Sequence, residues 1–404
     1  MSGDVFGNGM LLSEHIRLVA AFDHRDIFID PNPDAAASYA ERRRLFELPR
    51  SSWSDYSRDL ISEGGGVFSR WAKQIKLTPR IREALGVDDG VETMTPNDLM
   101  RAVLLAPVDL FWNGGIGTYI KASDETNAEI GDRANDAVRV DGRDLRVRVI
   151  GEGGNLGVSQ RGRIEAAQHG VSVNTDAIDN SAGVDTSDHE VNIKILLADA
   201  VRDGALALEE RNELLASMTD EVGSKVLRHN TDQNTLLGNA RVQGPQMLHV
   251  HRRLIADLES DGFLDRELEF LPDEAEIDRR LEAGEGLTSP EFSVLLAYSK
   301  LRLKNEVGAS ELVDDPWLVR ELLGYFPEAL REPYATTMEN HPLRREIITN
   351  SLVNGLVNRG GITFVHRAVE ETGARAEEIV KAFVVAREVF DAQSFIDDLS
   401  LIHI

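Results

Sequence analysis

Short apolar runs alternate with helix-like stretches over the first half of the chain. Between Ile16 and about Ala200, four runs rich in β-branched and aromatic residues predict strands, at 17–22, 108–112, 147–150 and 171–173. Strands that alternate with helices in this way are typical of βα units around a parallel sheet. The pattern therefore predicts an α/β domain.

A polar or glycine-rich segment follows each predicted strand. Asp23 closes the first, Asn113 closes the second, and Gly-Glu-Gly-Gly-Asn155 follows the third. The segment 174–176 follows the fourth. Because open α/β sheets bind ligands in a crevice at the carboxyl ends of their strands, we expect these four loops to face one site.

The hydrophobic period changes beyond about residue 200. Apolar positions 215, 218, 222 and 226 recur every three or four residues, as on one face of a helix. Ser289-Pro290-Glu291 combines a helix N-cap, a first-turn proline and a first-turn acid. A last long helix is predicted over 374–390, after a break at Gly360-Gly361. We therefore predict two domains, an α/β domain at 1–203 and a helical domain at 204–404.

Composition narrows the classes of partner. The 404 residues include 44 Lys and Arg against 69 Asp and Glu, and the net charge of −25 would repel nucleic acid. No apolar run approaches the roughly 18–20 residues needed to cross a bilayer, and residues 1–12 lack the pattern of a signal peptide. We expect a soluble, cytoplasmic protein that binds neither nucleic acid nor membrane. The absence of cysteine excludes disulfides, Cys-ligated metals and a thiol nucleophile.

The first residues suggest a phosphate-binding turn. Gly3, Gly7 and Gly9 precede a helix-like stretch from Leu11 to Ile16, and missing side chains would let a pyrophosphate approach backbone N–H groups. A plain tight turn is the alternative, because no strand stands upstream. Asp23 follows about 20 residues later, where a carboxylate accepts both ribose hydroxyls of NAD. Together these features favour a dinucleotide site, although Asp23 alone would be read as a turn or helix cap.

Three asparagines are further candidates for ligand contacts. Asn155 and Asn180 each offer an amide donor and acceptor beside small residues, which suits a nicotinamide or its ribose. The alternative is that both are turn formers. Asn113 opens a glycine-rich loop that has no Walker lysine, and its role stays open.

Two histidine motifs are weaker candidates. His189 follows Ser187-Asp188, but adjacent side chains on a helix diverge and no oxyanion motif is visible, so a serine hydrolase is not expected. His249 and His251 could share a strand face as metal ligands. The surrounding pattern is helical and no third ligand is nearby, so we expect a structural pair and predict no metal site.

Taken together, these motifs resemble the large bacterial NAD-specific glutamate dehydrogenases over essentially the whole chain except its last few residues. The stretches that carry the resemblance are 3–10, 107–119, 151–157 and 174–185. The smaller hexameric glutamate dehydrogenases offer a second comparison, since their Glu-Gly-Ala-Asn is similar to 152–155 and their Asn-Ala-Gly-Gly-Val, followed by Ser, is similar to 180–184 followed by Ser187.

The resemblance implies a Rossmann-like NAD-binding sheet and a set of contacts. Those implied for NAD are Asp23, Asn155 and Asn180, and we add to the predicted cofactor site Asn113 and the turn residues Gly3, Asp4 and Val5. Ser187 is implied to contact the side-chain carboxylate of the substrate, and Asn180 is included in the same substrate site.

The departures from the family concern catalysis. The family's catalytic Lys and Asp lie in a preceding substrate domain, and none of Lys73, Lys76, Lys121 or Lys194 has the corresponding glycine-rich setting. We therefore expect no catalytic residue here, a cofactor domain whose first strand is missing, and no activity from this chain alone. Met1 is interpreted as an internal methionine, and residues 399–404 as either adapter-encoded sequence or an ordinary frayed tail.

The function predicted for the parent enzyme is the NAD-dependent interconversion of L-glutamate with 2-oxoglutarate and ammonia, a step of glutamate catabolism in which the parent is expected to be a homo-oligomer. Two alternatives remain. The parent could oxidise a different amino acid, because most carboxylate-recognising residues would lie upstream. The helical half could instead serve as a cofactor-free oligomerisation or regulatory module.

Overall fold

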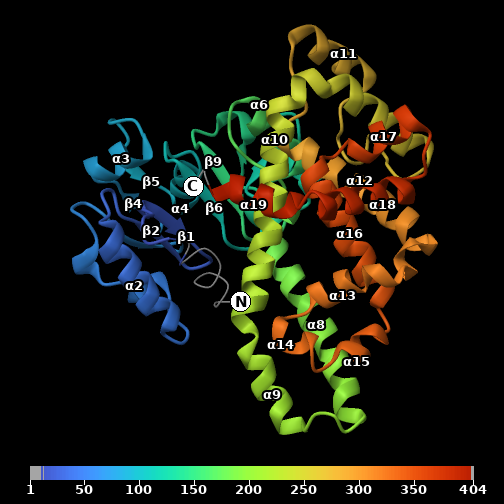
Figure 1. Cartoon of the computed structure of the whole chain (residues 1–404). Helices are drawn as coiled ribbons and strands as arrows, with labels where there is room; N and C mark the ends of the chain where they lie inside the picture. The colour runs from blue at the N-terminus through green and yellow to red at the C-terminus, as the bar shows by residue number, and fades with distance from the viewer. Residues whose placement is uncertain (1–10, 12, 402–404) are drawn as a thin grey trace. The chain divides into compact units, whose positions relative to one another are not determined.

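The computed structural model describes residue 11 and residues 13–401 (Figure 1). The predicted phosphate-turn residues Gly3, Asp4 and Val5 lie outside these residues. The described chain forms two compact units. The first contains the residues up to Asn180 together with Thr288–Pro290, and the second contains Ser181–Leu287 and the residues from Glu291 onward.

The compact units divide at Asn180, whereas the sequence analysis placed a domain boundary at 203. The reason is that helix α8 (Ser181–Arg202) packs against helix α10 (Thr219–Ser260) and is therefore grouped with the helical unit. The assignment of domains 1–203 and 204–404 stays a prediction.

An antiparallel sheet opens the first unit. Its strands are β1 (Ala20–Phe22), β2 (Asp26–Ile29) and β3 (Gly66–Ser69), in that order. The prediction that the first apolar run feeds a parallel βα unit was wrong, because β1 pairs antiparallel with β2. The N–H of Asp23 donates to the carbonyl of Asp26 at 3.0 Å, so the chain reverses in a tight turn that leaves no room for a crossover helix.

Parallel pairing occurs between later strands of the first unit. Strand β6 (Leu110–Asn113) pairs with β9 (Val149–Glu152), and Ser172 forms a single parallel bridge with Val149. Strand β7 (Ile120–Lys121) pairs in parallel with β8 (Val140–Asp141). The second and third predicted strands are therefore confirmed in position and direction. The fourth is present as one bridge.

An apolar core fills the space behind these parallel pairs. Its buried members are Leu104, Ile120, Val140, Val147, Ile150, Val158, Ala166, Val171 and Val173. Most are β-branched, which suits the crowded surface of a pleated sheet. The core fixes the carboxyl ends of β6 and β9, which position the candidate site.

The other elements of the first unit surround these sheets. Strands β4 (Ile75–Lys76) and β5 (Thr93–Met94) form an antiparallel pair. The helices are α2 (Ala35–Glu47), α3 (Pro79–Leu85), α4 (Pro96–Leu104), α5 (Asn127–Ile130), α6 (Gln160–Gln168) and α7 (Asp176–Asp179).

The helix predicted from Leu11 to Ile16 is not formed by the described residues 11 and 13–16, which make turns. The Ser13 hydroxyl accepts the N–H of His15 at 3.1 Å, and the Ser13 carbonyl accepts the N–H of Ile16 at 3.4 Å. A serine that bonds to nearby backbone in this way competes with helix formation.

The second unit is helical, as the sequence predicted. Besides α8 and α10, its helices are α9 (Leu208–Ser217), α11 (Glu274–Ala283), α12 (Ser289–Ala309), α13 (Val319–Tyr325), α14 (Glu328–Arg331), α15 (Ala335–Glu339), α16 (Arg344–Gly360), α17 (Phe364–Thr372), α18 (Ala376–Val389) and α19 (Ala392–Leu401). The predicted start at Ser289, the break after Gly360 and the helix over 374–390 are confirmed by α12, α16 and α18. Among the described residues, no helix is long and apolar enough to span a membrane.

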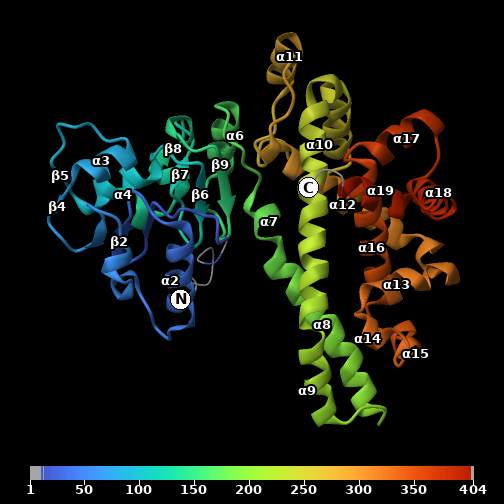
Figure 2. The same ribbon diagram turned by 60° about the vertical axis from the view of Figure 1, so that its left-hand side comes forward.

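Helix α10 is the longest element, with 42 residues, and α8 lies alongside it (Figure 2). Pro245 stands inside α10 and cannot donate to the carbonyl of Arg241. Gly286 approaches this point so closely that a Cβ on it would lie 2.7 Å from the carbonyl carbon of Gly244.

Candidate functional site

The candidate site lies where β6 and β9 end. Asn113 is the last residue of β6, and its carbonyl accepts the N–H groups of Gly153 and Gly154 at 2.9 and 3.0 Å. These two bonds hold the loop that follows β9 against the end of β6. The structure thus brings together two of the polar loops that the sequence analysis expected at one edge.

Glycines permit this close approach of backbones. A Cβ on Gly154 would lie 2.4 Å from the carbonyl oxygen of Gly115, and a Cβ on Gly157 would lie 1.4 Å from the amide of Asn113. The Asn113 side chain is buried, and in its better orientation it donates to the Gly115 carbonyl and accepts from the Gly157 N–H. Asn113 therefore joins the loops internally, and its contact with a cofactor stays a prediction.

Gly154→Ala should destabilise the first unit by about 1–3 kcal/mol, because the added methyl must displace backbone at Gly115 rather than a flexible side chain. Urea unfolding followed by tryptophan fluorescence would measure the loss. Gly90→Ala is the matched control, since a Cβ there meets nothing within 4 Å. Equal midpoints for the two variants would contradict the close approach.

A buried ion pair supports the loops from below. The guanidinium of Arg163, on α6, donates to both carboxylate oxygens of Glu152 at 2.7 and 2.9 Å. Glu152 is 0% exposed and Arg163 is 4% exposed. Burial alone would lower the pKa of Arg163, but its hydrogen bonds to Glu152 and the neighbouring carboxylates outweigh burial and raise that pKa. Burial also raises the pKa of Glu152, and the hydrogen bonds from Arg163 oppose that rise, so the carboxylate at the end of β9 depends on Arg163 to stay ionised.

Two aspartates extend this pair toward the next segment. Asp176 accepts the N–H of Leu156 at 2.8 Å and lies 3.3 Å from Arg163. Asp179 accepts the N–H of Glu152 at 3.0 Å, and burial raises its pKa. We call these four residues, Glu152, Arg163, Asp176 and Asp179, the ionic scaffold. It fixes the loop after β9 relative to α7.

Two more exposed side chains, the amides of Asn155 and Asn180, adjoin the ionic scaffold in the sequence. Asn155 ends the glycine-rich loop and is exposed, and Asn180 follows α7 and is partly exposed. The Asn180 amide donates to the Asn155 amide oxygen at 3.0 Å. Among the described residues, no partner bonds the Asn155 Nδ2 or the Asn180 Oδ1. The pair therefore has one free donor, the Asn155 Nδ2, and one free acceptor, the Asn180 Oδ1.

Asp23 occupies a different environment. It is largely buried, and its Oδ1 accepts the N–H groups of Arg25 and Asp26 at 2.7 and 2.8 Å in the β1–β2 turn. The turn-forming alternative from the sequence is thus observed. Its second oxygen, Oδ2, accepts no bond from the described residues, so a ligand contact stays a prediction.

The remaining candidate, Ser187, lies on an exposed face of α8 in the second unit. Its substrate contact stays a prediction.

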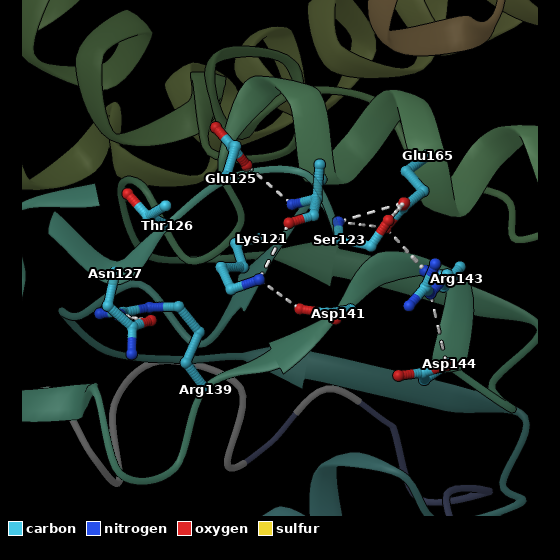
Figure 3. Close-up of polar contacts among 12 residues, drawn as sticks. Lys121, Ser123, Glu125, Thr126, Asn127, Arg139, Asp141, Arg143, Asp144 and Glu165 are labelled. Carbon is cyan, nitrogen blue, oxygen red and sulfur yellow. Dashed lines mark hydrogen bonds and ion pairs between the residues drawn. The ribbon is translucent and has the colours of Figure 1, made fainter. Parts of the chain in front are cut away.

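Sequence reasoning missed a second polar network, which includes Lys121, Asp141 and Glu165 (Figure 3). Lys121 donates to Asp141 at 2.5 Å, joining β7 to β8. Glu165 accepts the N–H groups of Ser123 and Arg143, each at 3.0 Å, and so attaches α6 to the segments that follow β7 and β8. Because α6 also carries Arg163, this network positions the ionic scaffold. No sequence motif marks this network, since its members are charged residues scattered along the chain.

Comparison with known proteins gives two family matches. Residues 1–240 match the family described as bacterial NAD-glutamate dehydrogenase, catalytic domain, and residues 284–402 match glutamate dehydrogenase, C-terminal.

Three relatives, each named NAD-specific glutamate dehydrogenase, are similar to 96% of the chain. The protein from Mycobacterium tuberculosis is 56% identical over 394 residues, that from Halomonas elongata is 53% identical over 390, and that from Pseudomonas aeruginosa is 52% identical over 390. The chain spans 24% of the length of each of these relatives.

Proposed function

Because the chain belongs to the bacterial NAD-glutamate dehydrogenase family, we propose that it is part of an enzyme that converts L-glutamate to 2-oxoglutarate and ammonia with NAD. The names of the relatives support this reaction and this cofactor. The observation in the structure that carries the proposal is the amide pair of Asn155 and Asn180, held at the carboxyl ends of parallel strands.

The amide pair suits a primary carboxamide. A nicotinamide carboxamide has one carbonyl acceptor and one NH₂ donor, which match the free Asn155 Nδ2 and the free Asn180 Oδ1. We assign these two residues to the nicotinamide end of NAD, with Asn113 supporting the loop beneath. The parallel strands would then belong to a Rossmann-like sheet.

NAD would supply the hydride acceptor, and this chain would orient it. The ionic scaffold holds the loop that carries Asn155, and the amide pair would therefore hold a bound nicotinamide ring in one position. Asp23 is proposed to accept the ribose hydroxyls through its free Oδ2, and Gly3, Asp4 and Val5 to contact the pyrophosphate. Ser187, with Asn180, is proposed to contact glutamate.

The proposal is tested with a full-length protein that contains this segment. Glutamate and NAD should give steady production of NADH, whereas leucine should give little. Faster turnover of leucine would favour the dehydrogenase of another amino acid. If titration calorimetry of the full-length protein with NAD gave no saturable heat, the cofactor-free module would be favoured instead.

Asp23→Ser should weaken NAD binding roughly tenfold to a hundredfold, because a charge-assisted pair of hydrogen bonds is worth about 1.5–3 kcal/mol. The preference for NAD over NADP should narrow, since the carboxylate would no longer repel a 2′-phosphate. Titration calorimetry of the full-length protein with NAD and with NADP measures both the loss of affinity and the change in preference.

Asp34→Ser is the control for Asp23→Ser. Asp34 is also a carboxylate that accepts a backbone N–H, that of Ala37 at 2.8 Å, but it caps α2 and is exposed. This control should leave both affinities unchanged. If Asp23→Ser behaved in the same way, Asp23 would be only a turn residue.

A further inference from the structure

Three potential metal ligands converge between α8 and α10 in the second unit. Asp185 and His189 are four residues apart on α8 and so share one face of that helix, and His229 comes from α10. The His229 Nδ1 lies 2.7 Å from one Asp185 oxygen, and the His189 Nε2 lies 3.9 Å from the other. One donor atom from each residue lies within 4.8 Å of the other two.

His189 is the unusual member of this group. It is 1% exposed, and neither of its ring nitrogens has a hydrogen-bond partner among the residues that the structure describes. A buried polar atom without a partner is costly, and such atoms in native structures often mark an ion or a water. An imidazole nitrogen without a hydrogen-bond partner can give its lone pair to a metal ion.

The surroundings hold the His189 ring and join the two helices. The ring of Tyr325 stacks on His189 with centroids 4.3 Å apart, and Asn192 donates to the Tyr325 hydroxyl at 2.9 Å. Next to His229, Asn230 donates to the Ser181 hydroxyl at 2.8 Å and so fastens α10 to α8.

We propose that Asp185, His189 and His229 bind a divalent transition-metal ion, with Zn²⁺ as the representative ligand. Imidazole suits Zn²⁺ and its first-row neighbours, whereas Mg²⁺ and Ca²⁺ prefer oxygen ligands alone. Zn²⁺ binds nitrogen and oxygen at about 2.0–2.2 Å, so two of its ligand atoms can lie up to about 4.4 Å apart. The 3.9 Å between His189 and Asp185 is within this limit, and the widest separation in the cluster, at most 4.8 Å, has to shorten only slightly. His229 is half exposed, which leaves the remaining positions open to water.

The positive charge of Lys225 near His189 opposes the binding of a metal ion, but its amine is bound to another group. Lys225 acts on His189 electrostatically, but its amine donates to the Gly324 carbonyl at 2.9 Å, and burial lowers the pKa of Lys225. The carboxylate of Asp185 supplies the compensating negative charge. This site goes beyond the proposed function, because neither NAD nor glutamate takes part in it.

The test is titration of the 404-residue chain with Zn²⁺ by calorimetry and with Co²⁺ by visible absorption, without NAD or glutamate. We expect one ion per chain and no comparable binding of Mg²⁺. His229→Gln and Asp185→Asn should each weaken Zn²⁺ binding by at least about tenfold, because even the loss of outer partners of metal ligands costs that much. Both side chains are partly exposed, so these variants should keep the circular dichroism of the parent chain.

His249→Gln is the matched control, since it changes an exposed histidine on the same helix α10 outside the cluster. It should bind Zn²⁺ as the parent chain does, and Zn²⁺ should shift the ring resonances of His189 in both. The proposal is overturned if the folded chain binds no Zn²⁺ saturably. It is equally overturned if His229→Gln and Asp185→Asn retain full affinity, or if His249→Gln loses it.

Discussion

Arg163→Met should lower the free energy of unfolding of the first unit by about 3–5 kcal/mol, the usual cost of removing one partner from a buried ion pair. The loss is large because Glu152 is fully buried and receives two hydrogen bonds from Arg163, at 2.7 and 2.9 Å. Without them its charge would be left uncompensated at the end of β9.

Urea unfolding in a Trp317→Phe background measures this effect. Trp53, Trp71 and Trp112 then remain, and all three lie in the first unit, so fluorescence follows that unit alone. The double variant Glu152→Gln with Arg163→Met should recover part of the loss, since no unpaired charge remains.

Arg161→Met provides the contrast on the same helix. Arg161 pairs with Asp124 at a more exposed position, and surface pairs of this kind contribute at most about 1 kcal/mol. If Arg161→Met and Arg163→Met cost the same, the ionic scaffold would not be the support that we describe.

Asn180→Ala should reduce turnover of a full-length protein containing this segment on the order of a hundredfold, because a nicotinamide displaced by about 1 Å loses roughly that much rate. Folding should change little, since the side chain makes one hydrogen bond, to the exposed Asn155 at 3.0 Å. Steady-state assays with glutamate and NAD give the rate, and thermal melting gives the stability.

A second asparagine separates the two readings of Asn180. Asn340 also caps the end of a helix, α15, and its amide donates to the Thr336 carbonyl at 2.9 Å. Asn340→Ala should leave turnover intact. If Asn180→Ala lost melting temperature in proportion to rate, Asn180 would be a turn former, the alternative that the sequence left open.

Local pattern predicted the elements better than their pairing. The runs at 108–112 and 147–150 became β6 and β9 because apolar residues of both runs, among them Phe111 and Ile150, pack in the same core. The run ending at Phe22 has the same apolar pattern, yet the chain reverses directly after it and the strand pairs antiparallel with the next one. The turn is made by Asp23 bonding to the N–H groups of Arg25 and Asp26, and no glycine or proline marks it in the sequence.

Asn155 and Asn180 could be predicted from the sequence because of their local surroundings. Asn155 and Asn180 stand beside small residues at strand and helix ends, where an amide has few internal partners. Arg163 gave no such signal, because a charged residue on a helix is usually solvated, and its burial depends on the tertiary contacts with Glu152 and Asp176. The pairing of His189 with His229 was equally hidden, since it depends on how α8 packs against α10.

Pro245 should divide amide hydrogen exchange along α10 into two regimes. The missing donor interrupts the ladder of backbone hydrogen bonds at Pro245, so the part of the helix on each side can open by itself. The later half holds most of the buried residues, among them Leu248, Leu254, Ile255 and Leu258, and should exchange more slowly. His229 lies in the earlier half, where a bound ion would add protection without reaching beyond the proline.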